Sequence, residues 1–199
     1  GLYGPTETLI IADQSADPTL VAADLLAQAE HDPLATALLV TTSADLAVAV
    51  QLQLKRQIPT LHRQGIIEES LARTAAAIVV ADLDEALRVS NEFAPEHLCL
   101  AVRDPWGCLE GVTNAGGVFM GEWASEALGD YVIGPSHVMP TSGTARFSSP
   151  LHVRDFLRVT SIFAPARQTI DVIAPAGAVI ARAEGLTAHA AAIEARLEP

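Results

Sequence analysis

Several residue types are scarce in this chain of 199 residues, and each scarcity excludes a class of protein. The two cysteines, Cys99 and Cys108, cannot build a disulfide framework, and both lie among apolar residues, where a small buried thiol is the expected role. The longest apolar runs, such as residues 75–81, fall far short of the roughly 20 residues that span a bilayer. We therefore expect a soluble protein in a reducing, cytoplasmic setting.

Basic residues are also few, since 12 Lys and Arg oppose 24 Asp and Glu and give a net charge of −12. This balance argues against nucleic acid and membrane surfaces as partners, because binding to either anionic surface draws on positive charge. Two phosphate-binding motifs are missing as well: no G-x-G-x-x-G follows an apolar segment, and no G-x-x-x-x-G-K-[ST] occurs. The chain therefore carries no dinucleotide-binding fingerprint.

Hydrophobic residues make up 50% of the chain, which is enough for a substantial core and excludes disorder. Short apolar segments alternate with amphipathic ones, and we expect strands at residues 8–12, 37–40, 77–80, 98–102 and 117–120. Asp17, Ser43 and Asp82 precede the amphipathic segments and are good helix N-caps. This alternation predicts the α/β class, with a Rossmann-like parallel sheet.

The character of the chain changes after Gly134, where Pro, Ser, Thr and Gly replace the apolar pattern up to Pro150. We interpret this segment as a functional loop. Helical patterns then occur around residues 153–157 and again over 176–197. The predicted organisation is an α/β domain over residues 1–150 and a helical C-terminal tail over residues 151–199.

Two pairs of residues could carry chemistry. Gln28 and His31 are three positions apart at the end of a predicted helix, so their side chains can converge on one ion. The alternative is a surface histidine that compensates the helix dipole. Glu96 and His97 are neighbours that could share acid–base work, or form an ordinary surface ion pair. They precede their strand, whereas ligands of such sheets usually bind at the carboxyl ends of the strands.

Four further residues lie in segments that could bind a ligand. Asp130 precedes the loop and could be a metal ligand, although Asp is also an ordinary turn residue. His137 lies in a loop whose hydroxyls, glycines and single arginine suit a polar ligand, or which is only a packed surface loop. Glu184 and His189 flank a break between two tail helices, where His189 on spacing alone is a helix-end residue.

Six motifs occur in order along the whole chain and together resemble the histidinol dehydrogenase family. They are Gly-Pro-Thr-Glu at 4–7, Gln-Ala-Glu-His-Asp-Pro at 28–33, Ala-Pro-Glu-His-Leu at 94–98, Gly-Asp-Tyr at 129–131, the segment 137–149 and Glu-Gly-Leu-Thr-Ala-His at 184–189. The resemblance implies a zinc enzyme of histidine biosynthesis. Such an enzyme oxidises L-histidinol through an enzyme-held aldehyde to L-histidine, and it uses NAD twice.

The resemblance also implies roles for individual residues. It places the zinc ligands at Gln28, His31, Asp130 and His189. His97 would be the base toward the substrate hydroxyl in the first oxidation, and Glu96 would activate water in the second. Thr6 stands where the family commonly has Ser, which keeps the hydroxyl. The implied substrate-binding residues are Thr6, Gln28, His31, His97, Asp130, His137, Glu184 and His189.

Two further expectations follow from the resemblance. His189 and Glu184 would complete the site of a partner subunit, which makes the expected assembly an intertwined homodimer with shared active sites. Family members carry a long N-terminal portion before the Gly-Pro-Ser/Thr-Glu motif, and it contains the residues that contact NAD. We therefore expect this chain to be a C-terminal fragment, with an incomplete Rossmann-like domain that binds NAD poorly and turns over little on its own.

Three alternatives remain at this stage. A related branch of the family oxidises other small alcohols, such as sulfonated diols, on similar motifs. The chain could also be a non-catalytic zinc-binding or dimerisation module. A zinc hydrolase is the third alternative, but no H-E-x-x-H motif supports it.

Overall fold

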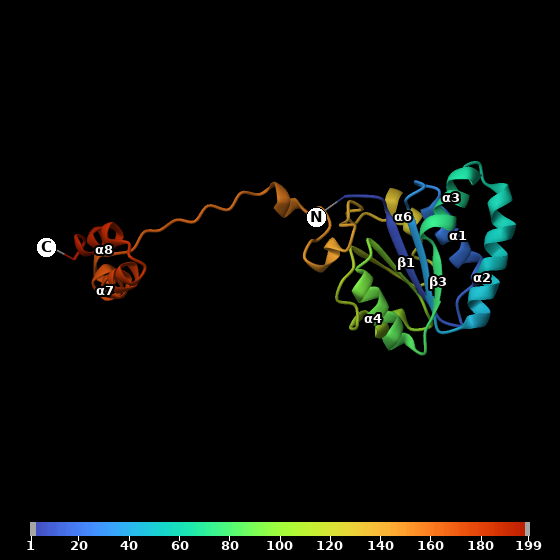
Figure 1. Ribbon diagram of the computed structural model, residues 1–199, viewed down its shortest axis with the longest axis horizontal. Helices are drawn as coiled ribbons and strands as arrows, with labels where there is room; N and C mark the ends of the chain where they lie inside the picture. The colour runs from blue at the N-terminus through green and yellow to red at the C-terminus, as the bar shows by residue number, and fades with distance from the viewer. Residues whose placement is uncertain (1–2, 198–199) are drawn as a thin grey trace. The chain divides into compact units, whose positions relative to one another are not determined.

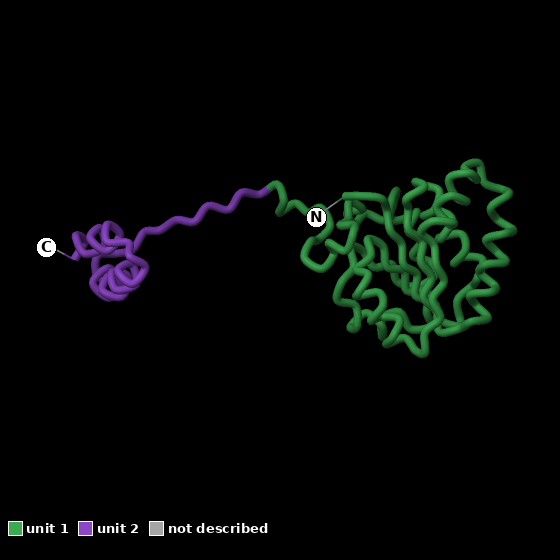
Figure 2. The backbone as a smooth tube through the Cα atoms, in the orientation of Figure 1, with its two compact units in different colours: residues 1–156 green, residues 157–199 purple. Residues whose placement is uncertain are grey.

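The computed structural model of the protein describes residues 3–197. It forms two compact units, the first reaching to Phe156 and the second beginning at Leu157 (Figure 2). The first unit contains one parallel sheet of five strands: β1 (Glu7–Ala12), β2 (Thr36–Thr41), β3 (Ala76–Val79), β4 (His97–Ala101) and β5 (Gly117–Met120). Their order is β3-β2-β1-β4-β5, which confirms the predicted α/β class.

Helices cover both faces of this sheet (Figure 1). On one face lie α1 (Pro18–Ala29), α2 (Ala44–Gln57) and α3 (Gln64–Thr74), and on the other lie α4 (Leu83–Phe93) and the short α5 (Pro105–Leu109). The central strand β1 supplies both layers, because alternate strand residues point to opposite faces. Its Ile10 packs with α1 and α2, whereas Leu9 and Ile11 pack with α4.

The predicted helix starts are confirmed by their cap hydrogen bonds. Asp17 accepts from the backbone N–H of Thr19, Ser43 from that of Leu46, and Asp82 from that of Glu85. Helix α3 was not predicted. It begins after Arg63 without a side-chain cap, so the local start signal is missing there. A short 3-10 helix, η1 (Ile58–Thr60), connects α2 to the loop before α3.

The segment after β5 approaches the start of β1. It begins with α6 (Glu126–Tyr131) and continues through the predicted loop, which contains the 3-10 helix η2 (Thr144–Arg146). Hydrogen bonds fix the loop to the start of the chain: Ser142 N–H donates to Glu7 Oε1 over 2.9 Å, and Gly4 N–H donates to Thr141 Oγ1 over 2.7 Å. Gly143 adopts φ 71°, a left-handed conformation that favours glycine. The 3-10 helix η3 (Val153–Phe156) ends the unit.

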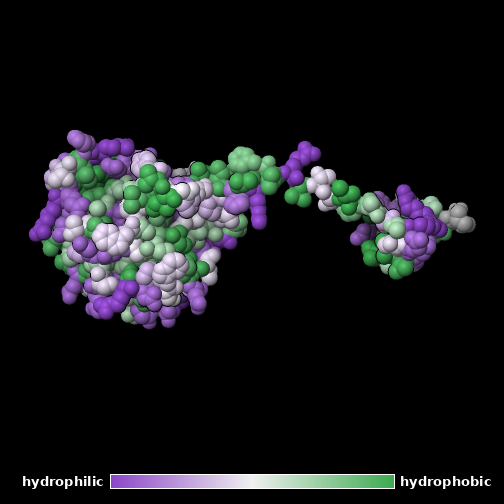
Figure 3. Space-filling view, turned by 180° about the vertical axis from the view of Figure 1, so that it is seen from behind, coloured by the Kyte–Doolittle hydropathy of each residue, from purple (hydrophilic) through white to green (hydrophobic). Residues whose placement is uncertain are grey.

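The second unit consists of an extended stretch and two packed helices, α7 (Arg167–Ala183) and α8 (Thr187–Glu194). The helical pattern predicted a start at residue 176, but α7 begins nine residues earlier and contains Pro175. Proline usually marks a helix start because it lacks the N–H, which is why the pattern placed the start too late. Apolar side chains of the extended stretch are exposed, such as Val159 and Phe163 at 92% and 88%. Figure 3 shows hydrophobic residues on the surface of this stretch.

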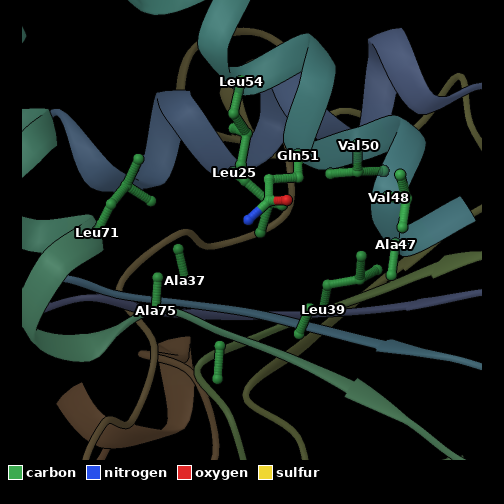
Figure 4. Close-up of a pocket in the computed structure, with 12 residues that line it drawn as sticks. Leu25, Ala37, Leu39, Ala47, Val48, Val50, Gln51, Leu54, Leu71 and Ala75 are labelled. Carbon is green, nitrogen blue, oxygen red and sulfur yellow. The ribbon is translucent and has the colours of Figure 1, made fainter. Parts of the chain in front are cut away.

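Three further features of the structure bear on function. Cys99 and Cys108 are free and buried, as predicted. None of the helices in the described part of the chain is long and apolar enough to cross a membrane. An apolar cavity of about 330 Å³ lies between the sheet and the helices of one face (Figure 4), and Gln51 is the one polar residue among the twelve that line it. None of the residues that line this cavity has an acid–base group.

Candidate active site

Polar side chains gather where β1 and β4 begin. The two strands are parallel neighbours with Thr8 opposite His97, so the residues before each strand lie side by side. Thr6 Oγ1 donates a hydrogen bond to Glu96 Oε2 over 2.7 Å, and the backbone N–H of Glu7 donates to the same oxygen over 3.1 Å. The site is therefore at the amino edge of the sheet, opposite to the edge where ligands of such sheets usually bind.

His97 is buried and held in one tautomer by the backbone. Its Nδ1 lies 2.9 Å from the carbonyl oxygen of Glu7, and because a carbonyl only accepts, Nδ1 carries the proton. This leaves Nε2 as the basic nitrogen, and His137 Nε2 lies 2.9 Å from it and donates to it. Burial lowers the pKa of His97 to about 4, with the nearby imidazoles of His137 and His31 adding to the effect. His97 is thus a neutral base at physiological pH.

Glu96 is a buried carboxyl, with 8% of the residue exposed. Burial raises its pKa, while the hydrogen bonds from Thr6 and Glu7 lower it and leave a net rise. One of its oxygens lies 3.6 Å from His97 Nδ1. A carboxylate with a raised pKa is a stronger base than a solvated one, so Glu96 suits proton transfer from water.

Two site residues come from the end of α1: Gln28 lies in its last turn, and His31 follows the helix. His31 Nδ1 lies 2.9 Å from the carbonyl oxygen of Ala27 and donates to it, so in the neutral ring Nε2 is the nitrogen with the free electron pair. That Nε2 lies 3.9 Å from Asp130 Oδ2. Gln28 is fully buried, and its Oε1 lies 3.3 Å from Thr6 Oγ1. Its Nε2 has no hydrogen-bond partner among the described residues, which is unusual for a buried amide.

Asp130 lies on α6 between two imidazoles. Its Oδ1 is 3.6 Å from His137 Nε2, and its Oδ2 faces His31. A cavity of about 230 Å³ opens beside it and is lined by His31, Asp130 and Glu126, together with Ala27, Glu30, Arg63, Ala127 and Tyr131. Polar contacts thus connect the predicted residues of this unit one after another, in the order Gln28, Thr6, Glu96, His97, His137, Asp130 and His31.

The other two predicted residues, Glu184 and His189, belong to the second unit. Glu184 caps the end of α7, His189 lies in the first turn of α8, and both are exposed. Their role in the site stays a prediction. Within residues 3–197, no three His, Cys, Asp or Glu side chains form a group that could hold a metal ion. Such a group would not include the amide of Gln28, which is one of the four predicted zinc ligands. The predicted set of zinc ligands therefore stays a prediction as well.

Sequence reasoning missed Glu126, the first residue of α6. It is 3% exposed and accepts a hydrogen bond from Thr8 Oγ1, and its Oε1 lies 3.8 Å from His97 Nδ1. Burial raises its pKa to about 8, and the nearby carboxyls of Asp24, Glu96 and Asp130 add to the rise. No motif or spacing in the sequence marks this residue, because its partner Thr8 is 118 positions away.

Comparison with known proteins identifies the family. The sequence model of the family described as histidinol dehydrogenase matches residues 1–197. The chain belongs to the histidinol dehydrogenase family. The motif resemblance is thereby confirmed.

Similar proteins carry the same description. The histidinol dehydrogenase of Deinococcus radiodurans is 53% identical over 199 residues, and the match covers 99% of this chain and 45% of that protein. That of Thermus thermophilus is 50% identical over 196 residues and is covered to 47%. The crystal structure of histidinol dehydrogenase from Elizabethkingia anophelis superposes with a TM-score of 0.91 at 36% identity, covering 98% of this chain and 45% of that one. The chain thus spans about half the length of the histidinol dehydrogenases that it matches.

Proposed function

We propose that this chain supplies the zinc and substrate residues of an enzyme that oxidises L-histidinol to L-histidine with NAD. The observation that carries the proposal is the set of Thr6, Gln28, Glu96, His97, Asp130, His137 and His31, which polar contacts connect into one group. It brings together a base, an activated carboxyl and metal donors, and His31 and Asp130 of this group line a cavity. Family membership supports this choice of reaction. The residues that contact NAD are proposed to lie in a preceding N-terminal portion.

The donor set fits zinc. His31 presents its Nε2 while its other nitrogen is fixed by a carbonyl, which is the arrangement usual for zinc-bound histidine. Asp130 Oδ2 lies 3.9 Å from it, and two donors bonded to one zinc at about 2.0–2.2 Å are roughly 3–4 Å apart. We propose the partner subunit's His189 as a further ligand, in a homodimer with shared sites that also brings Glu184 to the substrate.

The orphaned amide of Gln28 supports a ligand role as well. If this amide is turned by half a rotation, its Nε2 donates to Thr6 Oγ1, while the Thr6 hydroxyl still donates to Glu96. The orphaned atom is then the carbonyl oxygen of Gln28, which is an acceptor and a possible metal donor. A bound zinc would supply a fixed positive centre that holds the imidazole and amine of the substrate.

The proton transfers are assigned to chain residues. His97 Nε2 takes the proton of the substrate hydroxyl, while the carbonyl of Glu7 holds Nδ1–H and stabilises the imidazolium that forms. Without substrate, His137 donates a hydrogen bond to this Nε2, so the substrate hydroxyl must displace His137 from this hydrogen bond. Glu96 then takes a proton from the water that attacks at the aldehyde level. NAD, when bound, accepts the hydride in each oxidation.

The reaction can be tested with the full-length enzyme. NADH formation from L-histidinol, with bound zinc and histidine as product, is the expected result. Preference for a sulfonated diol would assign the chain to the related branch of dehydrogenases. Zinc and histidinol binding without hydride transfer would favour a non-catalytic module, and turnover without NAD would favour a hydrolase. An enzyme of this kind would work in the cytoplasm.

A further inference from the structure

Helix α6, which carries Asp130, is held to the sheet in an unusual way. A short surface helix normally docks through an apolar face. In α6 the apolar side chains of Leu128 and Tyr131 are exposed at 46% and 82%, and the buried residue of the helix is Glu126. The helix that presents the proposed zinc ligand is therefore anchored by a carboxyl group.

Two polar contacts fix the start of this helix. Glu126 accepts a hydrogen bond from the hydroxyl of Thr8 on β1, and Ser125 Oγ donates to Asp24 Oδ1 on α1 over 3.0 Å. Strand β1 follows Thr6 directly, and α1 carries Gln28 and leads to His31. Helix α6 is thus tied to the same two elements that position Thr6, Gln28 and His31.

The position of Asp130 depends on this anchor. Glu126 and Asp130 are four residues apart, so they share one face of the helix. Both line the cavity that also contains His31. A shift of the first turn would therefore move the Asp130 carboxylate relative to His31 Nε2.

We propose that Glu126, hydrogen-bonded by Thr8, is a positioning residue that docks α6 so that Asp130 faces His31. The proposal rests on the proposed zinc function of His31 and Asp130. Thr8 is fully buried and Glu126 nearly so, and a buried hydroxyl without an acceptor is costly. An apolar side chain of the same size would fill the space of Glu126 but leave Thr8 unpaired, so the acceptor oxygen is the part of Glu126 that matters.

Zinc affinity is the direct test, measured on the full-length enzyme by competition with a chelator. Replacing Glu126→Leu removes the acceptor and is expected to weaken zinc binding about 10–100-fold, as changes to groups that orient metal ligands do. Glu126→Gln keeps an oxygen that accepts from Thr8 and should hold zinc within a few-fold of the wild type. Glu68→Leu, an exposed glutamate on α3, is the matched control and should bind zinc as the wild type does.

A spectroscopic readout separates positioning from general loss of stability. The visible spectrum of the Co²⁺-substituted enzyme reports the ligand set, and it should change in Glu126→Leu but not in Glu126→Gln. Circular dichroism checks the fold of each variant. If Glu126→Leu does not fold, Thr8→Val replaces it, because this variant removes the donor with little change of shape and is expected to weaken zinc binding in the same direction.

The outcomes distinguish this inference from the proposed function. A folded Glu126→Leu or Thr8→Val protein with wild-type zinc affinity and Co²⁺ spectrum would overturn the positioning role. Equal impairment of Glu126→Gln and Glu126→Leu would overturn it too, because the oxygen that accepts from Thr8 would then not be the part of Glu126 that matters. If the wild-type enzyme binds no zinc, or if His31→Ala binds it normally, the proposed function itself is wrong.

Discussion

The two edges of the sheet use their polar groups differently. At the carboxyl edge a cavity of about 420 Å³ is lined by Asp13, Gln14, Thr42, Ser43, Ala81, Asp82, Leu83 and Arg103. Most of its side-chain acceptors are already engaged: Ser43 and Asp82 cap α2 and α4, and Asp13 accepts from the backbone of Ser15 and Arg103. At the amino edge the side chains contact one another across different elements. Polar groups thus serve local structure at one edge and a shared site at the other.

Helix direction gives a physical reason for this difference. Helices α1, α2 and α4 begin at the carboxyl edge, where their free N–H groups need acceptors and favour negative charge. Helix α1 ends at the amino edge, where its carbonyl groups favour positive charge, and the carbonyl of Ala27 accepts from His31. A cation is therefore better placed at the amino edge. The usual rule for ligands of parallel sheets does not anticipate a metal site at this edge.

The largest expected effect comes from removing the proposed base. His97→Ala in the full-length enzyme should keep its zinc and lose rate by about 10²–10⁴, the usual contribution of a general base. Steady-state NADH formation and metal analysis of the same sample measure the two properties. His62→Ala, an exposed histidine, is the control and should be unchanged. Full activity of His97→Ala would remove this residue from the mechanism.

Removing a proposed metal ligand should act on zinc rather than on proton transfer. His31→Ala takes away the Nε2 that faces Asp130, and zinc affinity should fall by more than the roughly 10–100-fold cost of changing a supporting group. Chelator competition measures the affinity, and excess zinc should restore part of the activity. Exposed His152, changed to Ala, serves as the control. Unchanged zinc binding in His31→Ala would place the metal elsewhere.

Acid should destabilise the metal-free protein through His97. The pKa of His97 is about 4 in the folded protein, whereas an unperturbed histidine, as in the unfolded chain, has a pKa of 6.5. Between these two pH values the unfolded chain therefore binds a proton that the folded chain does not. The stability from neutral His97 is full above pH 6.5 and is lost toward pH 4, about 3 kcal/mol in total.

The carboxyls that face His97 act in the opposite direction, so the His97 contribution must be isolated. Glu126, with its pKa raised to about 8, adds stability at low pH that fades as the pH rises from 4.5 toward 8, and Glu96 has the same sign. Denaturant titrations of wild type and His97→Gln at pH 7 and pH 4 give the difference. A wild type that loses no more stability in acid than the variant would contradict the assignment of a neutral His97.

Local signals predicted much of the fold, and the misses have physical causes. Asp17, Ser43 and Asp82 mark helix starts because a cap binds a backbone N–H only two or three residues away. Helix α3 has no such cap, and Pro175 inside α7 gave a misleading signal. Helix α7 continues through Pro175 and packs against α8, and Ala178 of α7 and Ala190 of α8 are both buried.

The site could be predicted only through the family motifs. Spacing alone left His31 as a possible surface residue and Glu96 with His97 as a possible ion pair. Their contacts depend on β1 and β4 being neighbours, which no short stretch of sequence encodes. Glu126 was missed for the same reason: a single glutamate after a serine is an ordinary helix start until Thr8 is placed against it.

The smallest expected effect concerns the carboxyl edge. Asp82→Ala removes the cap of α4 and should cost about 1 kcal/mol, a fall in melting temperature of roughly 2–4 °C for a unit of this size. The carboxylate of Glu85 still accepts from Ala81 N–H, so the helix should still form. Activity, zinc affinity and the KM for NAD should not change, because this edge is expected to serve the fold alone. A raised KM for NAD in a stable Asp82→Ala enzyme would show that the cavity at this edge contacts the cofactor, and the contrast between the two edges would then be wrong.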